Sequence, residues 1–148
     1  MKFRLRTLLR YAWAMPCSAL GMAVALLALA LGGRAQWRIG ALEVHGGLLA
    51  DACRRLPAHQ PFSAITLGHV ILGLDADCLD AARDHEQVHV RQYERWGLFF
   101  VPLYLGSSAW QRLHGRCPYR DNCFEREAYR QAVVGCGPSA SRPTAKVE

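Results

Sequence analysis

The chain opens with a long apolar run, and a mixed polar and apolar segment follows it. No charged residue interrupts positions 11–33, and a bilayer-spanning helix needs about 20 apolar residues. The run therefore predicts a transmembrane anchor, preceded by a basic N-terminal segment at residues 1–10. A cleaved secretory signal with a small-residue site near Ala28 is the alternative. Such signals usually have shorter apolar cores of about 7–15 residues, which favours a retained anchor.

The basic residues around this run predict its orientation. Four of them precede the run, whereas only Arg34 and Arg38 follow it closely. Cytoplasmic flanks of membrane helices carry the excess of Lys and Arg, so we expect the N-terminus in the cytoplasm. The rest of the chain would then lie outside the cytoplasm, as in a single-pass protein of the bacterial inner membrane.

The mixed segment at residues 34–136 predicts one small α+β domain. Residues 37–50 combine apolar positions with a double-glycine turn at Gly46 and predict a short hairpin. Residues 51–61, with two prolines, are expected to be irregular. Residues 62–72 are rich in β-branched and apolar side chains and predict the strongest strand of the chain.

The next segment has the features of a helix at both ends. No Pro or Gly occurs from Leu74 through Trp96. Asp75 or Asp77 can accept hydrogen bonds from the free backbone N–H groups at its start. Gly97 is suited to the turn that ends it. We therefore expect one long, uninterrupted helix here.

Two more helices and a tail complete the predicted domain. The apolar, aromatic-rich run at residues 98–110 is too short for an ordinary membrane span, so it predicts a buried helix or one at a membrane surface. A turn over residues 114–122 leads to a last helix at about residues 123–134. Residues 137–148 have the composition of a disordered end.

Charge and cysteine content narrow the class of protein only modestly. The net charge is +6, but the basic residues are scattered and no nucleic-acid-binding motif is present, so we expect no nucleic-acid partner. Six cysteines are present without any C-x-x-C spacing, which argues against a zinc finger. Cys117 and Cys123 bracket a short loop and are the first candidates for a disulfide, the alternative being that all remain thiols.

The sequence His85-Glu86-Gln87-Val88-His89 lies within the long predicted helix. Residues four apart share a helix face, so the two imidazoles can point at one ion. Zinc accepts such nitrogens at about 2.0–2.1 Å. Glu86 would then stand beside the ion as the general base that activates water. The segment predicts a zinc site with hydrolytic chemistry.

A catalytic zinc needs a third protein ligand and one open position. Glu125 follows on the last predicted helix, and the intervening helical hairpin can bring it back to the histidines. Glu127 is the rival ligand, but on a helix it points about 200° away from Glu125. Only one of the two can face the metal, and the E-x-x-A resemblance described next implies Glu125, with Ala128 three positions on.

The combination of HExxH with a later E-x-x-A resembles the His-His-Glu, or gluzincin-like, zinc peptidases, and distantly the prenyl-protease-like membrane peptidases. The string HEQVHVRQYERWGLFFVPLYL is also similar to small membrane-associated HExxHxxQ proteins. The resemblance covers residues 66–130. It implies a zincin-like domain in which His85, His89 and Glu125 bind Zn²⁺ and Glu86 is the base.

One departure from the resemblance concerns the surroundings of the metal ligands. Tyr129 stands where the prenyl-protease-like group has an aspartate that supports the site. Asp84 or Asp121 could take over that support. The departure leaves the three ligands themselves untouched.

Four further residues are candidates for contacts around the site. Gln92 lies on the same helix face as the two histidines, and His69, in the predicted strand, could reach substrate. Tyr119 and Tyr129 could donate hydrogen bonds to developing negative charge. For each of them an ordinary packing or hydrogen-bonding role is the alternative.

These features predict a membrane-anchored zinc metallopeptidase that acts on a peptide or protein substrate. Two other classes stay open on the sequence. One is a membrane protein whose zinc site is structural or sensory. The other is an interaction protein without metal, whose aromatic segment contacts lipid or a partner.

Overall fold

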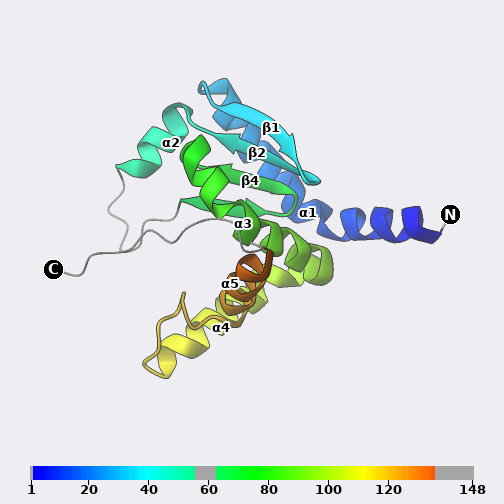
Figure 1. Ribbon diagram of the computed structural model, residues 1–148, viewed down its shortest axis with the longest axis vertical. Coiled ribbons are helices and arrows are strands. Elements are labelled where there is room, and N and C mark those ends of the chain that lie inside the picture. The colour runs from blue at the N-terminus through cyan, green and yellow to red at the C-terminus, as the bar shows by residue number, and fades with distance from the viewer. Residues whose placement is uncertain (1, 56–62, 136–148) are drawn as a thin grey trace.

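The computed structural model describes residues 2–55 and 63–135 of the chain, so the predicted tail and most of the predicted irregular segment at 51–61 lie outside it. The described part is α+β, as expected. Helix α1 (Lys2–Ala30) runs along the sheet, and helices α3, α4 and α5 follow the sheet in the chain (Figure 1).

Four short strands form one mixed sheet in the order β1-β2-β4-β3. The strands are β1 (Arg34–Arg38), β2 (Ala41–His45), β3 (Ala64–Leu67) and β4 (Val70–Gly73). β1 with β2 and β3 with β4 are antiparallel pairs, whereas β2 and β4 run parallel at the centre. The central pair carries buried Val44, Val70 and Ile71.

The predicted hairpin forms, but its turn lies elsewhere. The chain reverses at Ile39 and Gly40, both with positive φ, while Gly47 starts helix α2 (Gly47–Arg54). Residues 51–54 are therefore helical, and the prediction of irregular structure was wrong there. Hydropathy could not place the turn, because a turn depends on backbone angles that one glycine can supply.

The predicted strand over residues 62–72 was also wrong as a single strand. It is a hairpin of β3 and β4 that turns at Gly68 and His69, with Gly68 in the left-handed region at φ 63°. Every strand residue around the turn is apolar or β-branched, so composition alone shows no break. Consequently His69 lies in a turn and not within a strand.

The long helix matches its prediction. α3 (Ala76–Trp96) begins after Asp75, whose carboxylate accepts a hydrogen bond from the Cys78 N–H at 2.7 Å, and ends at Gly97. A short 3₁₀ turn, η1 (Gly97–Phe99), then leads into α4 (Phe100–Leu113). α5 (Cys123–Gly135) also forms where expected.

A buried ion pair ties α3 to the sheet. Glu43 on β2 is fully buried, and Arg83 of α3 donates to both its carboxylate oxygens at 2.8 and 3.0 Å. Gln36 of β1 donates a further hydrogen bond at 2.8 Å. Every oxygen of this carboxylate is thus satisfied, which is what a buried charge requires. The pair fixes the rotation of α3 relative to the sheet.

Helix α1 packs against the domain along most of its length. Its inner face is a row of small side chains that includes Ala14, Ser18, Gly21 and Ala28. A Cβ at Gly21 would stand only 2.6 Å from the Leu67 carbonyl oxygen, so only glycine permits this approach. α1 is therefore part of the hydrophobic core.

The outer face of α1 remains apolar and exposed. Within the described residues, the segment Leu9–Ala30 is long and apolar enough to cross a membrane. The remaining described helices lack that combination of length and hydropathy. The predicted N-terminal helix is therefore present, and its length and composition are those of a helix that could span a membrane.

Cys117 and Cys123 do not form the disulfide that their spacing suggested. Both are free thiols, as are the other three cysteines among the described residues. The Cys117 sulfur instead accepts a hydrogen bond from the Arg120 N–H at 3.4 Å. The loop between the two cysteines is held by Asp121, whose carboxylate accepts from the Cys117 N–H.

Candidate metal centre

Helix α3 presents both histidines of the HExxH segment to helix α5. The helix is anchored to the sheet side by Leu79, which is fully buried in a cluster with Ile71 and Val90. With that face fixed, His85 and His89 point the other way, one turn apart. Their rings meet edge to face with centroids 4.8 Å apart. The sequence prediction of a shared face is confirmed.

Helix α5 brings the third group, and Asn122 sets where it starts. This side chain is fully buried, and its oxygen accepts from the Phe124 N–H at 2.9 Å, which caps the helix. Its amide donates to the Tyr104 carbonyl and to Ser108 on α4. Because α5 starts here, Glu125 falls in its first turn and faces α3. Ala128, also fully buried, lets the two helices approach.

The three groups form a compact triangle of ligand atoms. His85 Nε2 lies 3.1 Å from His89 Nε2 and 3.1 Å from a Glu125 oxygen, and His89 Nε2 lies 3.4 Å from the other oxygen. Two ligands held about 2.0–2.1 Å from a tetrahedral zinc ion are roughly 3.3 Å apart. One ligand atom from each of the three residues can be chosen so that all three lie within 4.8 Å of one another, so these residues could hold a metal ion.

Glu125 is buried and carries an oxygen without a normal partner. Its Oε1 accepts a hydrogen bond from the Tyr104 hydroxyl at 2.7 Å. Its Oε2 faces the histidines but accepts no hydrogen bond of good geometry from any described residue. A buried carboxylate oxygen in that position is costly unless a cation is near. This atom is the strongest indication that the centre is built for a positive ion.

The charges at the centre perturb one another. Burial tends to raise the pKa of Glu125, but contacts with His85 and His89 outweigh it and hold that pKa well below its usual range. For His89, burial tends to lower the pKa, whereas the carboxylates of Glu125 and Glu86 raise it overall. Glu125 and His89 thus each favour the charged form of the other.

Gln92 orients His89, as its place on the helix face suggested. Its amide nitrogen donates to the Phe124 carbonyl oxygen at 3.1 Å and to Glu127 at 2.9 Å, and both of these are acceptors only. The amide oxygen must therefore be the atom that lies 2.8 Å from His89 Nδ1. Nδ1 then carries the proton, which leaves the Nε2 lone pair free for a metal.

Glu86 is held from the sheet side. It is buried, and Thr66 of β3 donates to its Oε2 at 2.6 Å. Thr66 also lies 3.4 Å from the Glu86 backbone carbonyl oxygen. The edge strand thus fixes the rotamer of this carboxylate beside the histidines.

Tyr119 and Tyr129 both lie at the centre. The Tyr129 ring is 4.6 Å from the His85 ring, centroid to centroid. Burial, then hydrogen bonding to Tyr129 and the charge of Glu125, raises the pKa of Tyr119 above its ordinary value. The Tyr119 phenol therefore keeps its proton at neutral pH and can donate it in a hydrogen bond.

His69 and Glu127 lie outside the triangle. His69 is tied to α1 instead: its Nδ1 lies 3.0 Å from the Ser18 hydroxyl, and its ring stacks on Tyr11 at 4.0 Å. We expected His69 to reach substrate because we assigned it to a strand. It lies instead in the turn between β3 and β4, where it contacts α1. Glu127 accepts a hydrogen bond from the Gln92 amide. It points away from Glu125, as the helical rotation between the two residues predicted.

Asp121 was one of the two aspartates proposed to support the site. Its carboxylate instead accepts a hydrogen bond from the Cys117 N–H, within the 117–121 loop. The structure gives it no contact with the three ligands. Tyr104, which donates to Glu125, gives one of the ligands a support that the sequence did not indicate.

Two contributors were missed from the sequence, Tyr104 and Thr66. Tyr104 lies one helical turn after Phe100 on the inner face of α4, and it is the single hydroxyl-bearing ring in an otherwise apolar run. A polar group at such a position usually has a buried partner. Thr66 gave no signal, because threonine is common in strands.

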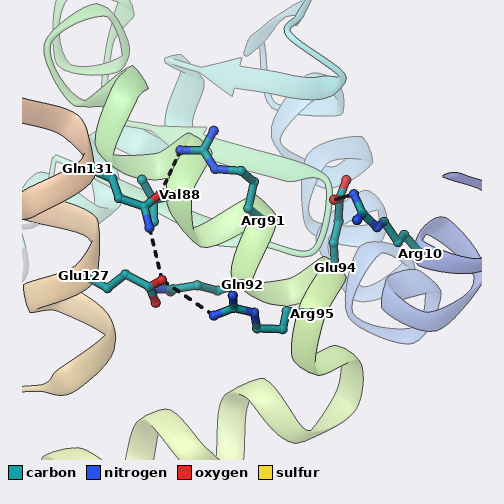
Figure 2. A pocket seen from close by; sticks show the side chains of 8 residues that line it. All are labelled: Arg10, Val88, Arg91, Gln92, Glu94, Arg95, Glu127 and Gln131. Atoms are coloured by element: carbon teal, nitrogen blue, oxygen red, sulfur yellow. Dashed lines mark hydrogen bonds and ion pairs between the residues drawn. The ribbon is translucent and has the colours of Figure 1, made fainter. Parts of the chain in front are cut away.

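A polar pocket of about 330 Å³ lies next to the centre, between α3 and α5 (Figure 2). Gln92 and Glu127 line it on one side, and Arg95 reaches within 3.7 Å of Glu127. Arg10 of α1 closes the far side through a contact of 3.6 Å with Glu94. Gln92 both lines the pocket and contacts His89, so it connects the pocket to the centre.

In comparisons with known proteins, no family model, curated protein or solved structure matches this chain. The function must therefore be argued from the centre itself.

Proposed function

We propose that this protein is a zinc-dependent hydrolase, with a peptide bond as the bond it cleaves. The observation that carries the proposal is the group of His85, His89 and Glu125, in which one buried oxygen of Glu125 faces His85 and accepts no hydrogen bond from any described residue. Two imidazoles and one carboxylate, each held by a second hydrogen bond or a packed ring, suit zinc. A group of three protein ligands leaves a fourth position for water.

Each surrounding residue has a role that its contacts support. Zinc, when bound, supplies a Lewis acid that polarises a carbonyl group and lowers the pKa of water. Glu86, held by Thr66, takes the proton from the attacking water and passes it to the leaving amine. The phenols of Tyr119 and Tyr129 can donate hydrogen bonds to the oxygen that becomes negatively charged.

The position of β3 favours an extended peptide as substrate. Among the described strands, β3 is an edge strand, so its outer backbone groups pair with no other described strand. An extended peptide can add to such an edge through main-chain hydrogen bonds. Because Thr66 of this strand holds Glu86, a peptide bound there would run beside the general base.

The experiment measures zinc and hydrolysis in the same preparations. Wild type should contain about one zinc per chain and cleave a mixed peptide library in a reaction that a zinc chelator stops. His85→Ala and Glu125→Ala should lose both metal and cleavage, whereas Glu86→Gln should keep the metal and lose cleavage. His114→Ala, an exposed histidine on the α4 terminus, is the matched control. Wild type without zinc would refute the proposal.

A structural or sensory zinc site is the second candidate, and burial favours it. The side chains of His85, His89 and Glu125 are only 14%, 9% and 3% exposed. Structural zinc sites are closed and contribute directly to folding. This candidate is preferred if Glu86→Gln changes no cellular phenotype while the ligand variants abolish it. A membrane location, supported by α1, is common to both candidates.

A further inference from the structure

Exposed apolar side chains of α1 and of the η1–α4 segment meet where Trp13 lies against Phe99, and we term this set of side chains the apolar face. Along α1 its members recur every seven residues, and along η1–α4 they follow helical spacing. Each is at least 41% exposed. The face comprises Trp13, Leu20, Leu27, Phe99, Leu103 and Trp110. Trp13 and Phe99 join the two helices, with ring centroids 6.1 Å apart. Contiguous apolar patches of this kind mark interaction sites.

The net positive charge of the chain lies in the part of the sequence that contains α1 and β1. Residues 1–42 contain six basic residues and no acidic one, and Glu43 is the first carboxylate of the chain. These six account for the whole net charge of +6, since the remaining 12 basic and 12 acidic residues cancel. In sequence they flank both ends of the apolar stretch of α1. An apolar helix with basic residues at both ends complements a surface of anionic lipid.

The packing of α1 decides how it can meet a bilayer. Its contacts with the domain extend from the Tyr11 hydroxyl, which donates to the Gly40 carbonyl, to Ala28, which packs with Val44 and Val70. About 17 residues of helix, roughly 25 Å, thus lie beside the sheet. If α1 crossed a bilayer in this arrangement, the open edges of β1 and β3 would lie in hydrocarbon, where unpaired backbone groups are not tolerated.

We propose that the apolar face lies flat on the surface of an anionic lipid bilayer, with α1 parallel to the membrane plane. Both ends of α1, and the basic residues beyond them, then meet the same lipid surface. The inner face of α4 remains on the domain, where Phe100 and Tyr104 pack beside His89. The proposal holds whether or not the metal centre is catalytic.

Vesicle binding tests the proposed occupant. Full-length protein should float with vesicles of phosphatidylcholine and phosphatidylglycerol at 7:3, and bind them at least tenfold more tightly than phosphatidylcholine alone at low salt. The double variant Leu103→Glu, Trp110→Glu should bind at least tenfold more weakly. Val133→Glu, at a 73% exposed apolar position of α5, is the matched control and should bind as wild type does. Unchanged thermal melting will show that the exposed substitutions preserve the fold.

Two results would overturn the proposal. One is a stable dimer that the double variant dissociates, with no vesicle binding by wild type, since the face would then cover a second copy of the chain. The other comes from reporters fused to the two termini in bacterial cells. A helix parallel to the membrane leaves both reporters on one side, whereas reporters on opposite sides would show that α1 spans the bilayer.

Discussion

Replacing Gln92 with leucine should weaken zinc binding without removing any ligand. The amide orientation is fixed by two acceptors, so its oxygen holds the proton on His89 Nδ1 and the lone pair on Nε2. Leucine has a similar volume but cannot fix the tautomer. Loss of such an outer partner costs 10–100-fold in metal affinity, about 1.4–2.7 kcal/mol.

The same substitution also removes a donor from two acceptors, one of them buried. The Phe124 carbonyl and Glu127 lose the amide, which should lower the free energy of unfolding by about 1–3 kcal/mol. Zinc affinity must therefore be compared between folded proteins. Circular dichroism will verify that each variant is folded. Gln131→Leu is the control, because Gln131 bonds the same Glu127 from the exposed side without contact to His89.

Competition with a zinc-chelating dye at pH 7.5 measures the affinity. We expect a 10–100-fold higher dissociation constant for Gln92→Leu and less than a twofold change for Gln131→Leu. A folded Gln92→Leu protein that binds zinc as tightly as wild type would refute the reasoning. The tautomer of His89 would then be irrelevant to the centre.

Four other substitutions test separate contacts. Thr66→Val should keep the zinc content but reduce peptide cleavage about tenfold, as loss of an orienting hydrogen bond does, measured as kcat. Gly21→Ala should lower the unfolding free energy by about 1–3 kcal/mol in urea denaturation, because the new methyl group meets backbone. Arg83→Leu should cost about 3–5 kcal/mol by leaving Glu43 charged and unpaired, and adding Glu43→Leu should restore most of it. In metal-free protein, Glu125→Gln should make the free energy of unfolding depend less on pH at acidic pH. The folded-state pKa of this carboxyl is lowered, so wild type gains stability above about pH 4.3 and loses it as the pH falls further. Equal slopes in the two proteins would contradict this.

The parts of the centre that follow helical spacing could be predicted from the sequence. His85 and His89 share a face because they are four residues apart, and Asp75 and Gly97 are local signals at the two ends of α3. The same periodicity predicted that only one of Glu125 and Glu127 can face the metal, and the E-x-x-A resemblance pointed to Glu125. Within a helix, direction depends on a fixed rotation of about 100° per residue, so sequence separation is sufficient.

The parts that depend on contacts between distant elements could not be predicted. The Tyr104 hydroxyl reaches Glu125 only because Asn122 ties α5 to α4. The hairpin turn at Gly68 lies within a run rich in apolar and β-branched residues, and hydropathy carries no information about the backbone angles of a turn. Membrane spans and buried helices also share the same hydropathy, so the packing of α1 could be recognised only from its row of small residues.

The packing of α1 has a consequence for how the chain folds during synthesis. Ala14 shares a core cluster with Phe124, which is made 110 residues later. At about 5–20 residues per second, roughly 5–20 s pass between the two. During that interval the inner face of α1 has no partner from the end of the chain, and its apolar surface is open to chaperones and lipid. Late contacts of this kind raise the contact order and slow the final step of folding.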